Sequence, residues 1–181
     1  LGRNSTTITI GDDPAAVHDY VTGRLTDRLP PESRYTLAEV ADKVVDRKQP
    51  FLFARLAVYE VLADPRRVTS QASFDELLAH GHAGIFTLAV ARLAASDPVA
   101  EGLLHVLAYA RGNGFPRSDG IWATAGSALT ATEVTDLDIA RTLELAAPYI
   151  MEDTEFGQAV YRLAHRTFAE HYWTADSHVD R

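Results

Sequence analysis

The stretch AVYRLAHRTFAEHYW (residues 159–173) contains a change of hydrophobic period. Apolar and polar side chains alternate over 159–163, which predicts a β-strand. From His165 onward the spacing of Phe168 and Tyr172 places these two rings on one face of a short helix. The sequence therefore predicts a strand that leads directly into a helix, with His165 at the joint.

The residues before this stretch predict a second strand and three helices. A strand is expected over 148–151, with an acidic turn over 152–157, so that the two strands form a hairpin. Helices are expected after Asp97, which precedes a proline, across 115–129, and after Thr135, which has capping-box spacing to an aspartate. Three helices followed by a two-stranded wing is the layout of a winged-helix domain, which we predict over 97–173.

The N-terminal half predicts a small helical domain over 12–70. Three helix starts are marked by Asp13 before a proline, by the capping-box spacing of Thr36 and Glu39, and by Pro50 ahead of FLFARLAVYEVLAD. The fold class expected for the whole chain is mostly α, a small helical domain followed by a winged-helix domain.

Connecting helices are expected between the two domains, over 71–96. Ser73 and Glu76 have capping-box spacing at their start. The last residues, 174–181, are expected to form a frayed tail.

Composition describes an ordinary globular protein and argues against several partners. Apolar residues make up 46% and charged residues 23%, and the formal net charge is −8. This acidity disfavours nonspecific binding to nucleic-acid phosphates or to anionic lipid. The apolar run over 83–95 contains Arg92 and is too short to span a bilayer. With no cysteine and no signal peptide, we expect a cytoplasmic protein without membrane or nucleic-acid partners.

Catalytic and metal-binding patterns are weak. The chain contains neither G-x-S-x-G nor the P-loop G-x-x-x-x-G-K-[ST], and Ser127 is interpreted as a capping or packing residue. His80 and His82 lie two apart, a spacing that does not suit metal ligands on one helix face. The acidic residues over 152–155 are interpreted as a solvated tip. We therefore expect no catalytic residue, no metal site and no enzyme activity in this segment.

Two alternative functions stay open at this point. A DNA-binding winged-helix regulator would use the third helix, TDLDIARTLELAA (135–147), but three acidic residues oppose one arginine there. That alternative needs a separate basic surface, for which the candidates are Arg3, Arg66, Arg67 and Arg117. The other alternative is an independent helical adaptor for protein–protein contacts.

Three stretches resemble one protein family. AVYRLAHRTFAEHYW is similar to the winged-helix end of STAND-class signal-transduction ATPases, especially the NACHT-like proteins of actinobacteria, through an H-x-x-F-x-E pattern at His165, Phe168 and Glu170. VLAYARGNGFPRSDGIWATAGSAL (106–129) resembles the family's G-x-G-[FL]-P followed by a helix with a tryptophan. KQPFLFARLAVYEVL (48–62) resembles the start of the last helix of the family's small helical domain. The resemblance covers about 12–173.

The resemblance implies a regulatory segment of a nucleotide-dependent switch. In such proteins ADP lies between a nucleotide-binding domain, the small helical domain and the winged helix, and exchange for ATP permits assembly. The family's phosphate-contacting histidine corresponds to His165. A proline that approaches the adenine corresponds to Pro50, although the usual Gly-x-Pro is here Lys48-Gln49-Pro50.

The implied partner is the nucleotide-binding domain of the same parent chain, expected before Leu1 with its Walker motifs. The segment itself would hold no cofactor, whereas ADP or ATP with Mg is expected in the parent, which would be an ATPase and would oligomerise.

The residues alone leave the role of each candidate open. His165 is equally able to cap or pack at its joint, and Pro50 to start a helix. An imidazole can also donate to a phosphate oxygen, and a charge-assisted bond of this kind contributes about 1.5–3 kcal/mol, enough to bias a two-state closure. Arg162 and Arg166 flank the histidine and could meet either nucleotide or another domain.

Overall fold

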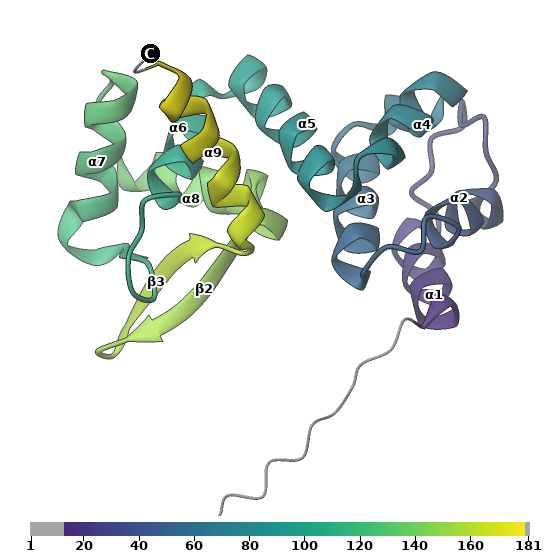
Figure 1. The fold of residues 1–181 in the computed structure, drawn as a ribbon, viewed down its shortest axis with the longest axis horizontal. Coiled ribbons are helices and arrows are strands. Elements are labelled where there is room, and N and C mark those ends of the chain that lie inside the picture. Colours follow the sequence, from purple (N-terminus) through teal and green to yellow (C-terminus); the bar gives the residue numbers. More distant parts are fainter. Residues whose placement is uncertain (1–12, 180–181) are drawn as a thin grey trace, which may run out of the picture. The chain divides into compact units, whose positions relative to one another are not determined.

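The computed structural model describes residues 13–179 of the chain, which are mostly helical with one three-stranded antiparallel sheet (Figure 1). The chain divides into two compact units, the first ending at Leu78 and the second beginning at Ala79. This division splits the predicted connecting segment 71–96, with its first helix almost wholly in the first unit and its second helix in the second. Each unit is described by itself.

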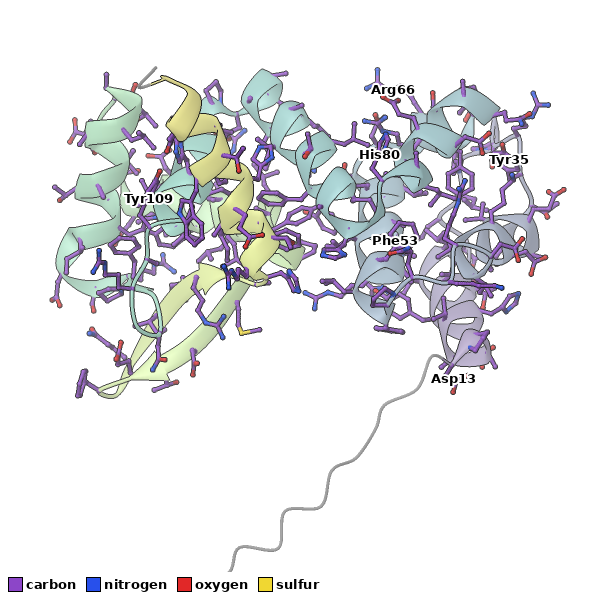
Figure 2. The ribbon with its side chains drawn as sticks, viewed as in Figure 1. Asp13, Tyr35, Phe53, Arg66, His80 and Tyr109 are labelled. Atoms are coloured by element: carbon purple, nitrogen blue, oxygen red, sulfur yellow. The ribbon has the colours of Figure 1, made fainter. Side chains whose placement is uncertain are left out.

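The first unit is a small set of helices around one central helix. Its α3 contacts both α1 and α2, and it also contacts the short helical turn η1. The helices are α1 (Pro14–Leu25), α2 (Leu37–Val45), α3 (Phe51–Ala63), η1 (Pro65–Val68) and α4 (Gln71–Ala79). The core side chains of α3 include Phe53, Leu56 and Val61, all nearly inaccessible to solvent. Figure 2 marks the position of Phe53 in this unit.

The predicted caps of the first two helices are confirmed. The Asp13 carboxylate accepts a hydrogen bond from the amide of Ala16 at 3.0 Å. At α2, the Glu39 amide donates to the Thr36 hydroxyl at 3.3 Å, and the Thr36 amide donates to the Glu39 carboxylate at 2.7 Å. These bonds satisfy amides that a helix start leaves without an intrahelical acceptor, which is why the sequence signal was reliable.

The predicted capping pair of Ser73 and Glu76 is wrong. Ser73 lies inside α4, and its own amide donates to the hydroxyl of Ser70 at 3.2 Å. Glu76 lies 3.4 Å from the guanidinium of Arg67 instead. Ser70 offers the same hydroxyl three residues earlier, so the helix begins one turn before the predicted position.

The second unit is also built around one helix. Its α6 contacts four other helices, α5, α7, α8 and α9, and the strand β3. The elements are α5 (Gly81–Ser96), α6 (Pro98–Leu107), β1 (Phe115–Pro116), η2 (Ser118–Gly120), α7 (Ile121–Thr130), α8 (Asp136–Leu145), η3 (Ala147–Tyr149), β2 (Ile150–Glu155), β3 (Gln158–Leu163) and α9 (Arg166–Val179). The predicted caps of α6 and α8 are confirmed: the Asp97 carboxylate accepts from the amide of Ala100, and the Thr135 hydroxyl accepts from the amide of Asp138.

The predicted hairpin is present, but its turn is shorter than expected. Strands β2 and β3 pair antiparallel from Ile150 opposite Leu163 to Glu155 opposite Gln158. The turn is Phe156-Gly157, and both residues have positive φ, as tight two-residue hairpin turns require. The prediction of a turn over 152–157 was wrong. The acidic residues at the end of β2 are mostly exposed, and they belong to the strand because their backbone pairs with β3. Figure 1 shows the hairpin extending from the helices of this unit.

The sheet has a third strand that the sequence analysis missed. Strand β1 pairs antiparallel with β3, which gives the order β1-β3-β2. It occupies the start of the predicted helix 115–129, so that α7 begins only at Ile121. Gly114 allows this pairing because its φ is +135°, and a Cβ there would lie 2.3 Å from the carbonyl oxygen of Tyr161.

The predicted frayed tail is wrong for residues 174–179, which continue α9. The indole of Trp173 donates to the carbonyl of Ala108 at 3.0 Å. The Asp176 carboxylate accepts from His105 at 2.9 Å and from the hydroxyl of Tyr109. These contacts with α6 and with the residues just after it hold the last turns of α9. The partners are distant in the sequence, so local patterns do not reveal the contacts.

No single described helix combines the length and the hydropathy needed to cross a bilayer. Helices α4 and α5 meet both criteria only when they are counted together across the break between them, by length and composition alone.

Candidate functional site

Pro50, the first candidate residue, precedes α3 in the first unit. It occupies the N-cap position with an extended backbone and makes no side-chain cap. In the loop before it, Lys48 has a left-handed backbone conformation, with a φ of +50°. Because proline has a fixed φ and no amide hydrogen, it can stand at the start of a helix with no unsatisfied donor of its own.

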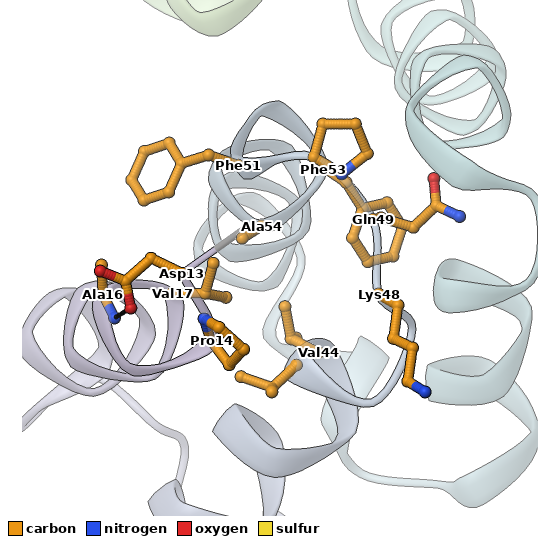
Figure 3. Close-up of a pocket in the computed structure, with 12 residues that line it drawn as sticks. Asp13, Pro14, Ala16, Val17, Val44, Lys48, Gln49, Phe51, Phe53 and Ala54 are labelled. Carbon is orange, nitrogen blue, oxygen red and sulfur yellow. Dashed lines mark hydrogen bonds between the residues drawn. The ribbon is translucent and has the colours of Figure 1, made fainter. Parts of the chain in front are cut away.

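Pro50 borders a hollow of about 610 Å³ between α1, α2 and α3 (Figure 3). Its walls are mainly apolar, and polar atoms come from Asp13, Lys48 and Gln49. The other lining residues are Pro14, Ala16, Val17, Val44, Val45, Phe51, Phe53 and Ala54. Apolar walls with a few polar groups are typical of pockets that bind small organic molecules.

His165, the second candidate residue, lies between β3 and α9 in the second unit. The backbone amide of Thr167 donates to its Nδ1 at 3.3 Å, and the hydroxyl of Thr167 lies 2.9 Å from the same nitrogen. The carbonyl of His165 also accepts from the amide of Phe168 at 3.1 Å. His165 therefore caps the start of α9 with its ring and with its backbone.

The ring of His165 packs against a second histidine. The rings of His165 and His82, which comes from α5, lie 4.9 Å apart between centroids, with planes inclined by 74°. Burial, together with the nearby charge that His165 can carry, lowers the pKa of His82. The buried Nε2 of His82 has no hydrogen-bond partner among the described residues. This environment favours an uncharged imidazole at His82.

An aromatic cluster supports this pair of histidines. Phe168 packs on His165, and its ring is stacked on Phe86 at 4.4 Å between centroids. Tyr149 completes the group with edge contacts to both phenylalanines. The cluster joins α5, the start of α9 and the segment before β2. It therefore fixes the joint at His165 through side chains that are distant in the sequence.

The two arginines beside His165 differ in their contacts. The guanidinium of Arg166 is exposed and pairs with Glu170 at 2.8 Å, one turn along α9. Arg162 lies on β3, where its guanidinium reaches the sulfur of Met151 on the neighbouring strand. Neither contact involves His165.

The candidate recognition helix α8 keeps its acidic character in the structure. Asp136 and Glu144 are exposed, whereas Asp138 is used in the cap with Thr135. The one arginine of this helix, Arg141, pairs with Asp97 at 2.7 Å, so its charge is compensated. Such a helix offers little attraction to a phosphate backbone.

Two arginines of the candidate basic surface, Arg66 and Arg67, have compensating carboxylates. Arg66 and Arg67 both lie near Asp64, at 2.8 and 3.7 Å, and Arg67 additionally meets Glu76. Figure 2 shows Arg66 in the first unit, whereas Arg117 belongs to the second. Arg3 lies outside the described residues.

Trp122 and Ser127 both take part in the packing of the second unit, as the interpretation of Ser127 as a capping or packing residue predicts. Trp122 is fully buried, and its indole donates to the carbonyl of Leu103 at 3.2 Å. Ser127 donates to the carbonyl of Ala123 and accepts from the amide of Val134. In residues 13–179, no group of three or more histidines, aspartates or glutamates is arranged to hold a metal ion.

Sequence reasoning missed Thr167 and His82 as partners of His165. Thr167 could have been found from the sequence, because a hydroxyl side chain two positions after a capping residue can form a hydrogen bond with that residue. His82 carries none, since it lies on α5 and only the fold brings it to the joint. Pro50 and His165 belong to different units, and each is defined only by its own surroundings.

Comparison with known proteins gives no assignment: the chain matches no protein-family model, no curated protein and no solved structure.

Proposed function

We propose that this chain is a regulatory segment of a STAND-type, NACHT-like switch, which docks on a P-loop nucleotide-binding domain and senses whether ADP or ATP is bound. In this proposal the segment has no catalytic activity of its own. It combines a small helical domain with a winged helix in one cytoplasmic protein. His165 contacts the phosphates, and Pro50 approaches the base.

The observation that carries the proposal is the joint between β3 and α9. The second unit has the order α6, β1, α7, α8, β2, β3, with the sheet order β1-β3-β2. A winged helix is built in this order, with a short first strand after its first helix. His165 then stands where the wing strand ends and the next helix begins, which is the position that the family resemblance assigns to the phosphate-contacting histidine.

The hollow beside Pro50 supports the other half of the proposal. A volume of about 610 Å³ is large enough for a nucleoside base, and its apolar walls suit a flat ring. Lys48 and Gln49 supply polar atoms for the ring edge or for a sugar. The first unit thus offers a place for a base next to the proline that the resemblance assigns to it.

A DNA-binding role has less support. The third helix of a reader of this kind enters the major groove, and cationic side chains hold it on the phosphates. Here α8 exposes acidic residues, and its one arginine is paired with Asp97. We therefore favour contact with another protein domain over contact with a duplex.

The decisive experiment uses the longer protein that the proposal requires, with its nucleotide-binding domain. We expect His165→Ala to release bound ADP about 10- to 100-fold faster, because the lost bond contributes about 1.5–3 kcal/mol. ADP that remains bound after purification is measured by chromatography, and oligomer size by light scattering. His18→Ala, a histidine substitution in the first unit, is the matched control.

Two results contradict the proposal. The first is unchanged ADP retention together with unchanged oligomer size in His165→Ala. The second is ATP hydrolysis by residues 1–181 alone. Salt-sensitive binding of the chain to duplex DNA, with a slope that reflects several phosphate contacts, would instead support the DNA-binding alternative.

A further inference from the structure

The hydrogen bonds at His165 restrict the protonation of its ring. A backbone amide can only donate, so the bond from Thr167 requires a lone pair on Nδ1 of His165. The Thr167 hydroxyl lies 2.9 Å from the same nitrogen and can donate to it as well. A proton on Nδ1 would remove the bond from the amide, and the hydroxyl would then have to accept from the ring instead of donating to it. The neutral ring that satisfies this arrangement carries its proton on Nε2.

Two further features act against a charged ring at this position. His165 precedes the first turn of α9, where the helix macrodipole is positive and disfavours a cation. His82 lies against it from α5, so that protonation of both rings would place two cations about 5 Å apart. The other charged side chains nearby in the chain are Arg162 on β3 and the Arg166–Glu170 pair on α9.

We propose that Thr167 and His82 are positioning residues that hold His165 as the neutral Nε2–H tautomer, so that it presents one uncharged donor to an anionic ligand. Thr167 occupies Nδ1, and His82 fixes the plane of the ring by edge contact. The identity of the anion, a nucleotide phosphate, rests on the proposed function, whereas the tautomer does not.

This proposal changes the chemistry expected of the switch. A contact made by imidazolium requires a proton and is lost as the pH rises. A contact made by a neutral Nε2–H donor needs no protonation and is conserved across neutral pH. The capping bond at Nδ1 and the ligand bond at Nε2 can then exist together, so ligand binding leaves the start of α9 intact.

The tautomer is measured on residues 1–181 with ¹⁵N-labelled histidine, from the two ring nitrogen chemical shifts at pH 7.5. We expect an unprotonated Nδ1 and a protonated Nε2 at His165, as a single state. An unrestrained neutral imidazole averages over both tautomers and gives intermediate shifts. A protonated Nδ1, or averaged shifts, would overturn the proposal.

Variants separate the two positioning residues. His82→Ala should move the His165 shifts toward the average, and His82→Phe should restore them because an aromatic edge remains. Thr167→Val should shift the Nδ1 resonance through loss of the hydroxyl, whereas Thr167→Ser should leave it in place. Unchanged shifts in His82→Ala or Thr167→Val would remove that residue from the proposal, and circular dichroism checks that each variant is folded.

A pH profile in the longer protein tests the ligand. We expect the rate of ADP release to change less than twofold between pH 6.5 and 8.5, and to stay equally flat in the His18→Ala control. Faster release with rising pH would show that an imidazolium makes the contact and would overturn the uncharged donor. If His165→Ala retains ADP while the tautomer is as expected, the proposed function fails and the positioning roles stand.

Discussion

The two units hold their candidate residues in opposite ways. Pro50 borders an open, apolar hollow in which the neighbouring Phe51 is about half exposed, at 48%. His165 packs against His82 and Phe168, and Phe168 is fully buried in a stack with Phe86. An open hollow leaves room for a ligand, whereas a closed cluster fixes the direction of a donor. The first unit therefore offers space, and the second offers orientation.

The largest expected effect comes from replacing one phenylalanine by alanine in each unit, beside each candidate residue. We expect Phe168→Ala to destabilise the second unit by about 3–5 kcal/mol, because it leaves a cavity among buried rings. Phe51→Ala, which removes a half-exposed ring in edge contact with Tyr20, should cost the first unit about 1 kcal/mol.

The measurement uses the positions of the tryptophans. Trp122 and Trp173 are the two tryptophans of the chain, and both lie in the second unit. Their fluorescence during urea unfolding therefore reports on that unit, while circular dichroism reports on helices of both. Equal losses in Phe168→Ala and Phe51→Ala would break the contrast between closed and open packing.

A smaller effect is expected at Gly114, within the second unit. Gly114→Ala should cost about 3 kcal/mol, since its Cβ would meet the backbone of Tyr161 at 2.3 Å in addition to the unfavourable φ. Gly120→Ala is the matched control, with a φ of +66° but open space around the Cβ, and should cost about 1 kcal/mol. Both are compared by tryptophan fluorescence, and equal costs would mean that β1 does not constrain this unit.

The smallest effect concerns pH. Burial lowers the pKa values of His82 and His171, both in the second unit. In the unfolded chain these rings take up protons near pH 6.5, whereas in the folded unit they do so only at lower pH. Their contribution to stability is therefore complete above about pH 6.5 and is lost as the pH falls toward the folded pKa values.

We expect the urea midpoint of the tryptophan signal to fall between pH 7 and pH 5.5, and to fall less in His82→Phe. The carboxylates with lowered pKa values, such as Asp138 and Asp176, respond only in more acidic solution. An identical pH dependence in the wild-type chain and in His82→Phe would rule out this role for His82.

Local chemistry explains which elements could be predicted. The caps at Asp13, Thr36, Asp97 and Thr135 are each formed by residues within three positions of one another, so the sequence contains the whole interaction. The mostly helical content could be predicted from equally local signals, the helix caps together with the helical spacing of apolar residues. The choice between Ser70 and Ser73 could not be made in this way, because both offer a hydroxyl.

The missed features depend on partners that are distant in the sequence. Strand β1 exists because Phe115 and Pro116 pair with β3, more than forty residues later. The last turns of α9 depend on Asp176 reaching His105 and Tyr109. His165 could be named as a candidate from its motif, but the ring that packs against it comes from α5. The sequence identified the residue, and only the fold supplied its surroundings.

The carboxylate of Asp97 controls whether the charge of Arg141 on α8 is compensated. One of its oxygens caps α6 through the amide of Ala100 at 3.0 Å, and the other holds Arg141 of α8 at 2.7 Å. An asparagine at this position would keep an oxygen for the cap while releasing the cation of Arg141. The surface of α8 would then become more basic without any change in α8 itself. A single substitution at the start of α6 would thus change the net charge that the surface of α8 presents.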